Sequence, residues 1–182
     1  MVKGFIRTKT LKKEDKSEVL NQIYKGNYIK IRNGLYANMD NLYGNMIDIP
    51  NIVRNGILCL YSAWYHYDMT TKIPEYFYVA IDRNRKSTLP QSIGIKLVYV
   101  TEKILDIGKT MEKIDGYDIS IYNRERCVCD AVKYRNKIGL DVMQEIIDSY
   151  INYPEKDFSL LMNYAKELRV YSKLKTYMEV KI

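Results

Sequence analysis

The stretch that decides the fold of the N-terminal part is residues 15–36, which read DKSEVLNQIYKGNYIKIRNGLY. Apolar residues from Val19 to Tyr24 recur at helical spacing, and Gly26 follows as a natural helix stop. Residues 28–32 then alternate with period two, which is typical of a β-strand. The stretch therefore predicts a helix, a turn and a strand in close succession.

The strand is predicted to fold back at Asn33-Gly34, the strongest short signal for a tight hairpin turn. Just upstream, residues 8–13 predict a short helix, and Phe5-Ile6 predict a short strand before it. A short strand, two helices and a basic hairpin in this order form most of a winged helix-turn-helix. A small α+β hairpin unit without that role is the alternative interpretation.

The charge of the chain is concentrated at its start. The 182 residues have a formal net charge of +7, and residues 1–36 hold nine basic and three acidic residues, against 20 and 19 in the remainder. A local basic excess indicates a polyanion partner, most often nucleic acid, whereas a solvated lysine-rich terminus is the alternative. Lysines and arginines would neutralise phosphates, and Ser17 and Asn21 would contact base edges. The candidate DNA-binding residues are Lys9, Lys16, Ser17, Asn21, Lys25, Lys30 and Arg32.

Residues 38–182 are predicted to form a second unit, a small sheet packed against a C-terminal helical cluster. Asp141 is expected to cap one of its helices and Pro154 to end that helix. A polar connector at residues 38–48 precedes these elements. The expected strands are 75–82, 95–100 and a hairpin within 110–122. The expected helices are 49–55, 58–67, 124–134, 141–152, 158–168 and 170–178.

A basic loop follows the first strand of this second unit. It contains Arg83, Arg85 and Lys86, and we interpret it as a candidate surface for an acidic partner or RNA. A solvated turn is the alternative, because charges on loops often have no partner.

Signals for catalysis are few. The sequence has no phosphate-binding glycine loop, no nucleophile elbow and no paired-histidine motif, and His66 is its single histidine. Three cysteines, an odd number, favour buried reduced thiols and a cytoplasmic protein without a metal or cofactor, and no signal or membrane-spanning segment is evident. The rival class is a metal-dependent nuclease or nucleotidyl-transfer enzyme. Its carboxylates would be Asp82, Asp106, Glu112 and Asp118.

The chain resembles the AbiEi-type antitoxins over almost its whole length. The order and spacing of several short motifs carry this resemblance. After the basic hairpin, these motifs are Tyr61-Ser62-Ala63, Ile73-Pro74-Glu75, the loop 83–86, Asn123-Arg124-Glu125-Arg126 with Asp130, Lys137-Ile138-Gly139, Tyr164-Ala165 and Leu168-Arg169-Val170.

The resemblance implies an antitoxin of a type IV toxin–antitoxin, or abortive infection, system. Such a protein represses its own promoter by binding double-stranded DNA. It also counteracts a nucleotidyltransferase-like toxin without forming a stable complex with it. Only Met1 to Ile6 precede the predicted helix pair, so the expectation is a partial winged helix at residues 1–37 followed by an α+β antitoxin domain at residues 38–182.

Overall fold

The structure, a computed structural model, describes residues 5–7, 11, 15–32, 34–38, 52–87, 89, 94–114 and 117–179. This part of the chain contains seven helices, a three-stranded sheet and a five-stranded mixed sheet. The expected α+β class is therefore confirmed. None of the helices in these ranges is long and apolar enough to cross a bilayer.

The N-terminal elements are a helix and a small antiparallel sheet. Helix α1 (Asp15–Tyr24) is followed by β2 (Tyr28–Arg32) and β3 (Leu35–Asn38), and β1 (Phe5–Arg7) pairs with β3, which gives the order β1-β3-β2. Glycines at both predicted turns adopt positive φ, 79° at Gly26 and 80° at Gly34. The connector was expected at residues 38–48, but Asn38 belongs to β3 and the rest of the connector lies outside the described residues. Most of the helix expected at residues 8–13 also lies outside them, and Leu11 is not helical.

The five-stranded sheet has the order β6-β5-β4-β8-β7. Its strands are β4 (Ile57–Leu58), β5 (Phe77–Asp82), β6 (Ile95–Val100), β7 (Lys109–Ile114) and β8 (Tyr117–Tyr122). β5 and β6 run parallel, β4 joins them to β8, and β7 and β8 form the expected hairpin.

One sequence prediction is wrong at the centre of this sheet. Leu58 was expected to begin a helix, but with Ile57 it forms the central strand β4, and both side chains are fully buried. The preceding residue permits this close fit, because a Cβ at Gly56 would lie 2.5 Å from the Val79 side chain. Helix α4 (Leu60–His66) begins only after β4 has ended.

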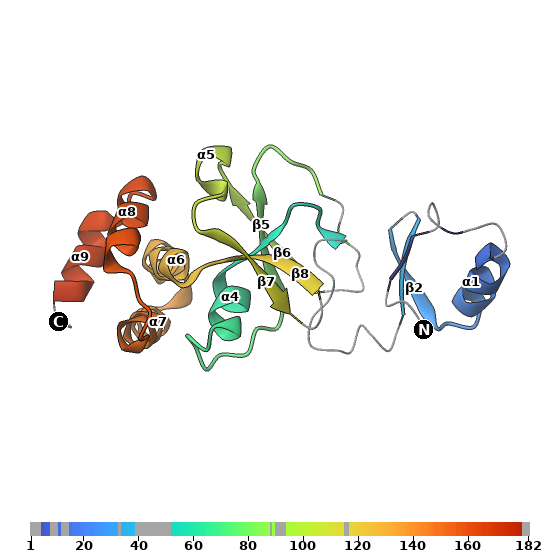
Figure 1. Ribbon diagram of the computed structural model, residues 1–182, viewed down its shortest axis with the longest axis horizontal. Coiled ribbons are helices and arrows are strands. Elements are labelled where there is room, and N and C mark those ends of the chain that lie inside the picture. The colour runs from blue at the N-terminus through green and yellow to red at the C-terminus, as the bar shows by residue number, and fades with distance from the viewer. Residues whose placement is uncertain are drawn as a thin grey trace.

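The C-terminal part is the predicted helical cluster. Figure 1 shows α6 (Arg124–Ile138) between the five-stranded sheet and the three following helices, α7 (Leu140–Asn152), α8 (Phe158–Glu167) and α9 (Tyr171–Glu179). The short helix α5 (Glu102–Leu105), which the sequence analysis did not predict, connects β6 to β7. Because α6 has neighbours on several sides, every residue from Glu125 to Val132 is buried.

The amphipathic stripe predicted on α7 is confirmed. Its buried residues are Val142, Met143, Ile146, Ile147 and Tyr150. The predicted cap is wrong, since α7 begins at Leu140 and Gly139, with φ at 92°, occupies the N-cap position. Asp141 lies inside the first turn, where the Val142 amide lowers the pKa of its carboxyl. Only glycine adopts this positive φ readily, so the backbone at residue 139 sets where the helix begins.

Candidate functional site

The predicted DNA-binding residues of α1 lie on its exposed side. Ser17 and Asn21 are one helical turn apart and therefore share a face, and Lys25 follows at the next turn. Lys16 is also exposed. No residue of α1 is buried, so its polar surface is open to a ligand.

The two basic residues of the hairpin lie where the strand ladder is irregular. Lys30 pairs with Tyr36 and Arg32 with Leu35, so the register shifts between them as at a β-bulge. Bulges bend a strand and change the simple alternation of its faces. The alternation of residues 28–32 in the sequence predicts Lys30 and Arg32 on one face, and this expectation assumes a regular ladder. Lys9 lies outside the described residues.

The basic loop after β5 is a fixed turn in which the three cations differ. The Asp82 carboxylate accepts a hydrogen bond from the Asn84 amide at 2.6 Å, which closes the turn. The Arg85 guanidinium is half-buried and donates to the Arg54 carbonyl oxygen. Arg83 and Lys86 remain exposed. The loop therefore offers two exposed cations, and the third holds the loop in place.

The carboxylates of the rival enzyme hypothesis have separate environments. Glu112 accepts a hydrogen bond from the Tyr67 hydroxyl at 3.2 Å, and Asp106 pairs with Lys109 at 3.3 Å. Asp82 closes the turn after β5. Within the described ranges, no group of three or more histidine, cysteine, aspartate or glutamate side chains is placed to hold a metal ion. In the described part of the chain, the structure thus does not gather three or more of these carboxylates at one place.

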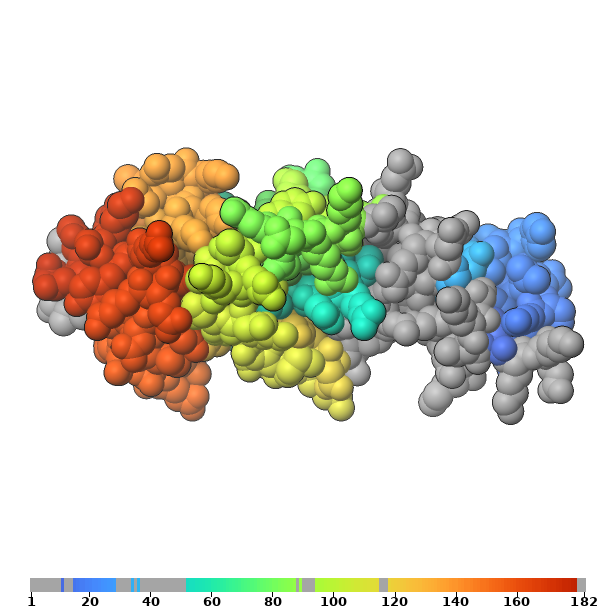
Figure 2. Space-filling view, turned by 90° about the horizontal axis from the view of Figure 1, so that it is seen from above, coloured from blue at the N-terminus to red at the C-terminus, as the bar shows by residue number. Residues whose placement is uncertain are grey.

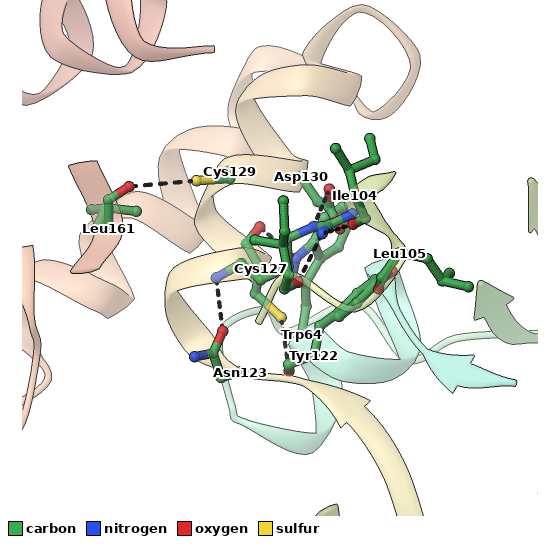
Figure 3. Close-up of polar contacts among 11 residues, drawn as sticks. Trp64, Ile104, Leu105, Tyr122, Asn123, Cys127, Cys129, Asp130 and Leu161 are labelled. Atoms are coloured by element: carbon green, nitrogen blue, oxygen red, sulfur yellow. Dashed lines mark hydrogen bonds and ion pairs between the residues drawn. The ribbon is translucent and has the colours of Figure 1, made fainter. Parts of the chain in front are cut away.

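A buried ion pair lies within α6, and its arginine also bonds to α5 and to the segment that follows α5 (Figure 3). The Arg126 guanidinium donates to Asp130 at 3.0 Å and to the carbonyl oxygens of Ile104 and Ile107, each at 2.8 Å. It also lies 4.1 Å from the centre of the Tyr122 ring. Arg126 and Asp130 are only 1% and 3% exposed, so the pair is enclosed in the core and has no open approach for a substrate.

Chain geometry around this pair is tight. Gly108 has φ at 74°, and a Cβ there would overlap the Cβ of Arg126. The Asn123 backbone amide donates to the Gly108 carbonyl at 2.7 Å. The Asn123 side-chain oxygen caps α6 by accepting from the Arg126 backbone amide. These contacts fix the first turn of α6 against the segment that follows α5.

The three thiols are buried in the same region. Burial raises the pKa values of the Cys59 and Cys127 thiols well above the usual range of a cysteine, and burial raises the pKa of Cys129 to about 12. The Asp130 carboxylate nearby acts in the same direction. Because the thiolate is the reactive form, these cysteines are structural, as the sequence predicted.

Sequence reasoning missed a hollow of about 760 Å³ that lies between α5, α6 and the turn from α8 to α9. We name it the basic hollow. Figure 2 shows α5, in yellow-green, against the segment of α8 and α9, in red. Its lining cations are Lys103, Lys133, Arg135, Arg169 and Lys173, and among the described residues that line it Glu167 alone is acidic.

A second hollow, of about 360 Å³, lies beside the edge strand β6. We name it the tyrosine hollow. Its aromatic residues are Tyr61, Tyr78, Tyr99 and Tyr134, and Lys137 supplies a cation at its side. No sequence motif marks either hollow, because their lining residues come from distant parts of the chain.

Comparison with known proteins adds no assignment: no model of a protein family matches the chain, and a search of curated proteins finds no match.

Proposed function

We propose that the protein is a DNA-binding regulator that contacts its promoter through α1 and the β2–β3 hairpin. The observation that carries the proposal is the order of elements, a helix followed by an antiparallel hairpin, at the most basic part of the sequence. In a winged helix-turn-helix a helix enters the major groove. The exposed Ser17 and Asn21 on α1, with Lys25 directly after the helix, support this orientation.

The regulator is proposed to be the antitoxin of a type IV toxin–antitoxin system. This finer assignment is supported by the motif order that resembles the AbiEi-type antitoxins. The partner would be a nucleotidyltransferase-like toxin, counteracted without a stable complex. Arg83 and Lys86 are the exposed cations through which residues 38–182 would act in this role.

Duplex binding across a salt series tests the DNA-binding proposal. With about four phosphate contacts, log affinity for promoter DNA should fall with log salt at a slope of roughly −3.6. The double change Lys30→Ala with Arg32→Ala should make the slope less steep by about 1.8. The matched control, Lys72→Ala with Lys113→Ala, removes the same charge elsewhere and should leave the slope unchanged. A salt-independent affinity, or equal effects of the two double changes, would contradict the proposal.

Growth rescue tests the antitoxin proposal. Expression of the full chain beside the toxin encoded next to it should restore growth. Arg83→Ala with Lys86→Ala should reduce rescue while leaving the turn intact, because Asp82 and Arg85 keep their contacts. Metal-dependent turnover of nucleic acid, abolished by Asp82→Asn or Asp118→Asn, would instead support the rival enzyme.

A further inference from the structure

Five cations line the basic hollow against one carboxylate, Glu167, and none of the five belongs to an ion pair of the described residues. The ion pairs of the described residues join other side chains, namely Lys72–Asp141, Lys109–Asp106, Arg126–Asp130 and Lys175–Glu179. Lys103, Lys133, Arg169 and Lys173 are exposed, while Arg135 is half-buried and donates to the Val132 carbonyl at 3.0 Å. Like charges around a concave surface concentrate a positive potential there. The basic hollow therefore attracts an anion.

Backbone conformation at Arg169 gives a second reason to assign a role to this hollow. Helix α8 ends in a Schellman motif, because the Val170 amide donates to the Ala165 carbonyl at 2.9 Å and the Arg169 amide to that of Lys166 at 3.1 Å. The motif places Arg169 at the position where glycine is usual, with φ at 59°. An arginine is strained there. Arg169 with this strained backbone is one of the residues that line the hollow.

Both hollows lie between the β6–α5 segment and the second half of α6. We name this shared boundary the seam. Tyr99 lines the tyrosine hollow and Thr101, two residues later, lines the basic hollow. On α6, Lys133 and Lys137 are one turn apart and line the basic and the tyrosine hollow respectively. The seam therefore offers cations at one end and aromatic rings at the other.

An aromatic ring in this seam is available for stacking. Tyr99 is 54% exposed on the edge strand β6. The Tyr61 and Tyr78 rings are 5.4 Å apart and half-buried, so they are held in place as a wall of the hollow. Ordered aromatic faces of this kind stack with exposed bases.

We propose that this seam binds a single strand of nucleic acid, with phosphates at the cations of the basic hollow and bases stacked on the tyrosines. Single-strand sites combine a positive groove with aromatic platforms, and both are present here. A duplex would not use the tyrosines, because its bases are already stacked inside. A wholly acidic peptide would use the cations alone. The proposed site is separate from α1 and the hairpin, and it does not depend on the proposed function.

Binding of a fluorescent 12-nucleotide single strand to the full chain tests the proposal. Uridine RNA and deoxyuridine DNA of this length are the two probes, and because they share the same base they identify which sugar the seam prefers. The main variant is Arg169→Gly with Lys173→Ala. Glycine relieves the positive φ at residue 169, so this variant should fold at least as well as the parent chain. The matched control is Lys72→Ala with Lys113→Ala, which removes two positive charges outside the seam.

The main variant should weaken single-strand binding roughly tenfold and make its salt slope less steep by about 1.4, which is 0.7 for each lost contact. Tyr99→Leu should weaken binding roughly 5- to 150-fold, whereas Tyr99→Phe, which keeps the ring, should retain it. Duplex promoter binding should be unchanged by all these variants and reduced by Lys30→Ala with Arg32→Ala. The two proposals can therefore fail separately.

Three results would overturn the inference. The first is the absence of binding by both strands at low salt. The second is an equal loss in the main variant and its matched control, which would reduce the effect to net charge. The third combines two observations: the parent chain and Tyr99→Leu bind inorganic polyphosphate equally, and they also bind the oligonucleotide equally. Together these results would show that the hollow binds anions without stacking on bases.

Discussion

The buried pair of Arg126 and Asp130 can be tested by a double-mutant cycle. Asp130→Leu leaves the Arg126 charge buried with only two carbonyl oxygens and the Tyr122 ring as partners. Breaking a buried pair in this way costs about 3–5 kcal/mol. Arg126→Met leaves the carboxylate buried, and it also removes the donor to Ile104 and Ile107, at about 1–3 kcal/mol for each unpaired carbonyl. The second change should therefore cost more than the first.

The double change should cost much less than the sum of the two. It removes both charges and leaves mainly the two unpaired carbonyl oxygens, whose cost is also part of the Arg126→Met change, so the coupling free energy should be at least about 3 kcal/mol. Urea unfolding of the parent chain, both single variants and the double variant measures it. Asp130→Asn is the matched control, because it keeps the shape and a hydrogen-bonding oxygen while removing the charge. Additive costs would refute the reasoning, since they would mean that the pair does not interact in the folded protein.

Three further predictions concern the core and its thiols. Ile147→Ala on α7 should lower the free energy of unfolding by about 2–5 kcal/mol, and a thermal shift near zero would show that the stripe is not core. The native protein should not react with a colorimetric disulfide reagent at pH 8, whereas all three thiols of the urea-unfolded chain should react. Rapid reaction of the native protein would contradict the burial of the thiols. Alkaline pH should destabilise the fold, because burial raises the pKa of Cys59, Cys127 and Cys129 above that of the unfolded chain. The stabilisation from the neutral thiols is complete below about pH 8.5, the pKa of an unfolded cysteine, and is lost as pH rises above that value. The loss is up to about 1.4 kcal/mol per thiol and pH unit, so a free energy of unfolding that stays constant to about pH 11 would contradict the prediction.

Most elements could be predicted from local patterns, because each pattern needs only its own residues. The stripe on α7 repeats every three or four residues along the whole helix, so one buried face follows directly. The hairpin of β2 and β3 follows from alternation on both sides of one turn. Long periodic segments contain enough repeats to identify a helix or a strand without knowing their neighbours.

The misplaced elements are short and depend on distant partners. β4 consists of Ile57 and Leu58, and two apolar residues have no period that could distinguish a strand from a helix. They form a strand because β5 and β8 pair with them on either side. The start of α7 depends similarly on the backbone of Gly139, whereas the sequence favoured Asp141 because aspartate is a common cap. The irregular ladder between Lys30 and Arg32 also leaves no trace in the alternation.

The two candidate nucleic-acid sites differ in the same respect, because one could be predicted from local sequence and the other could not. The basic excess of residues 1–36 is visible in the sequence because its charges are close together along the chain. The charges of the basic hollow escape such a count, since Lys103, Lys133 and Lys173 are separated by segments that contain compensating acids. A nearly neutral segment can therefore have a strongly positive surface wherever its fold gathers the cations and leaves the acids elsewhere. Here α5, α6 and α9 meet at one hollow, so its cations form a positive surface that only the tertiary structure creates, separate from the basic excess of the N-terminal residues.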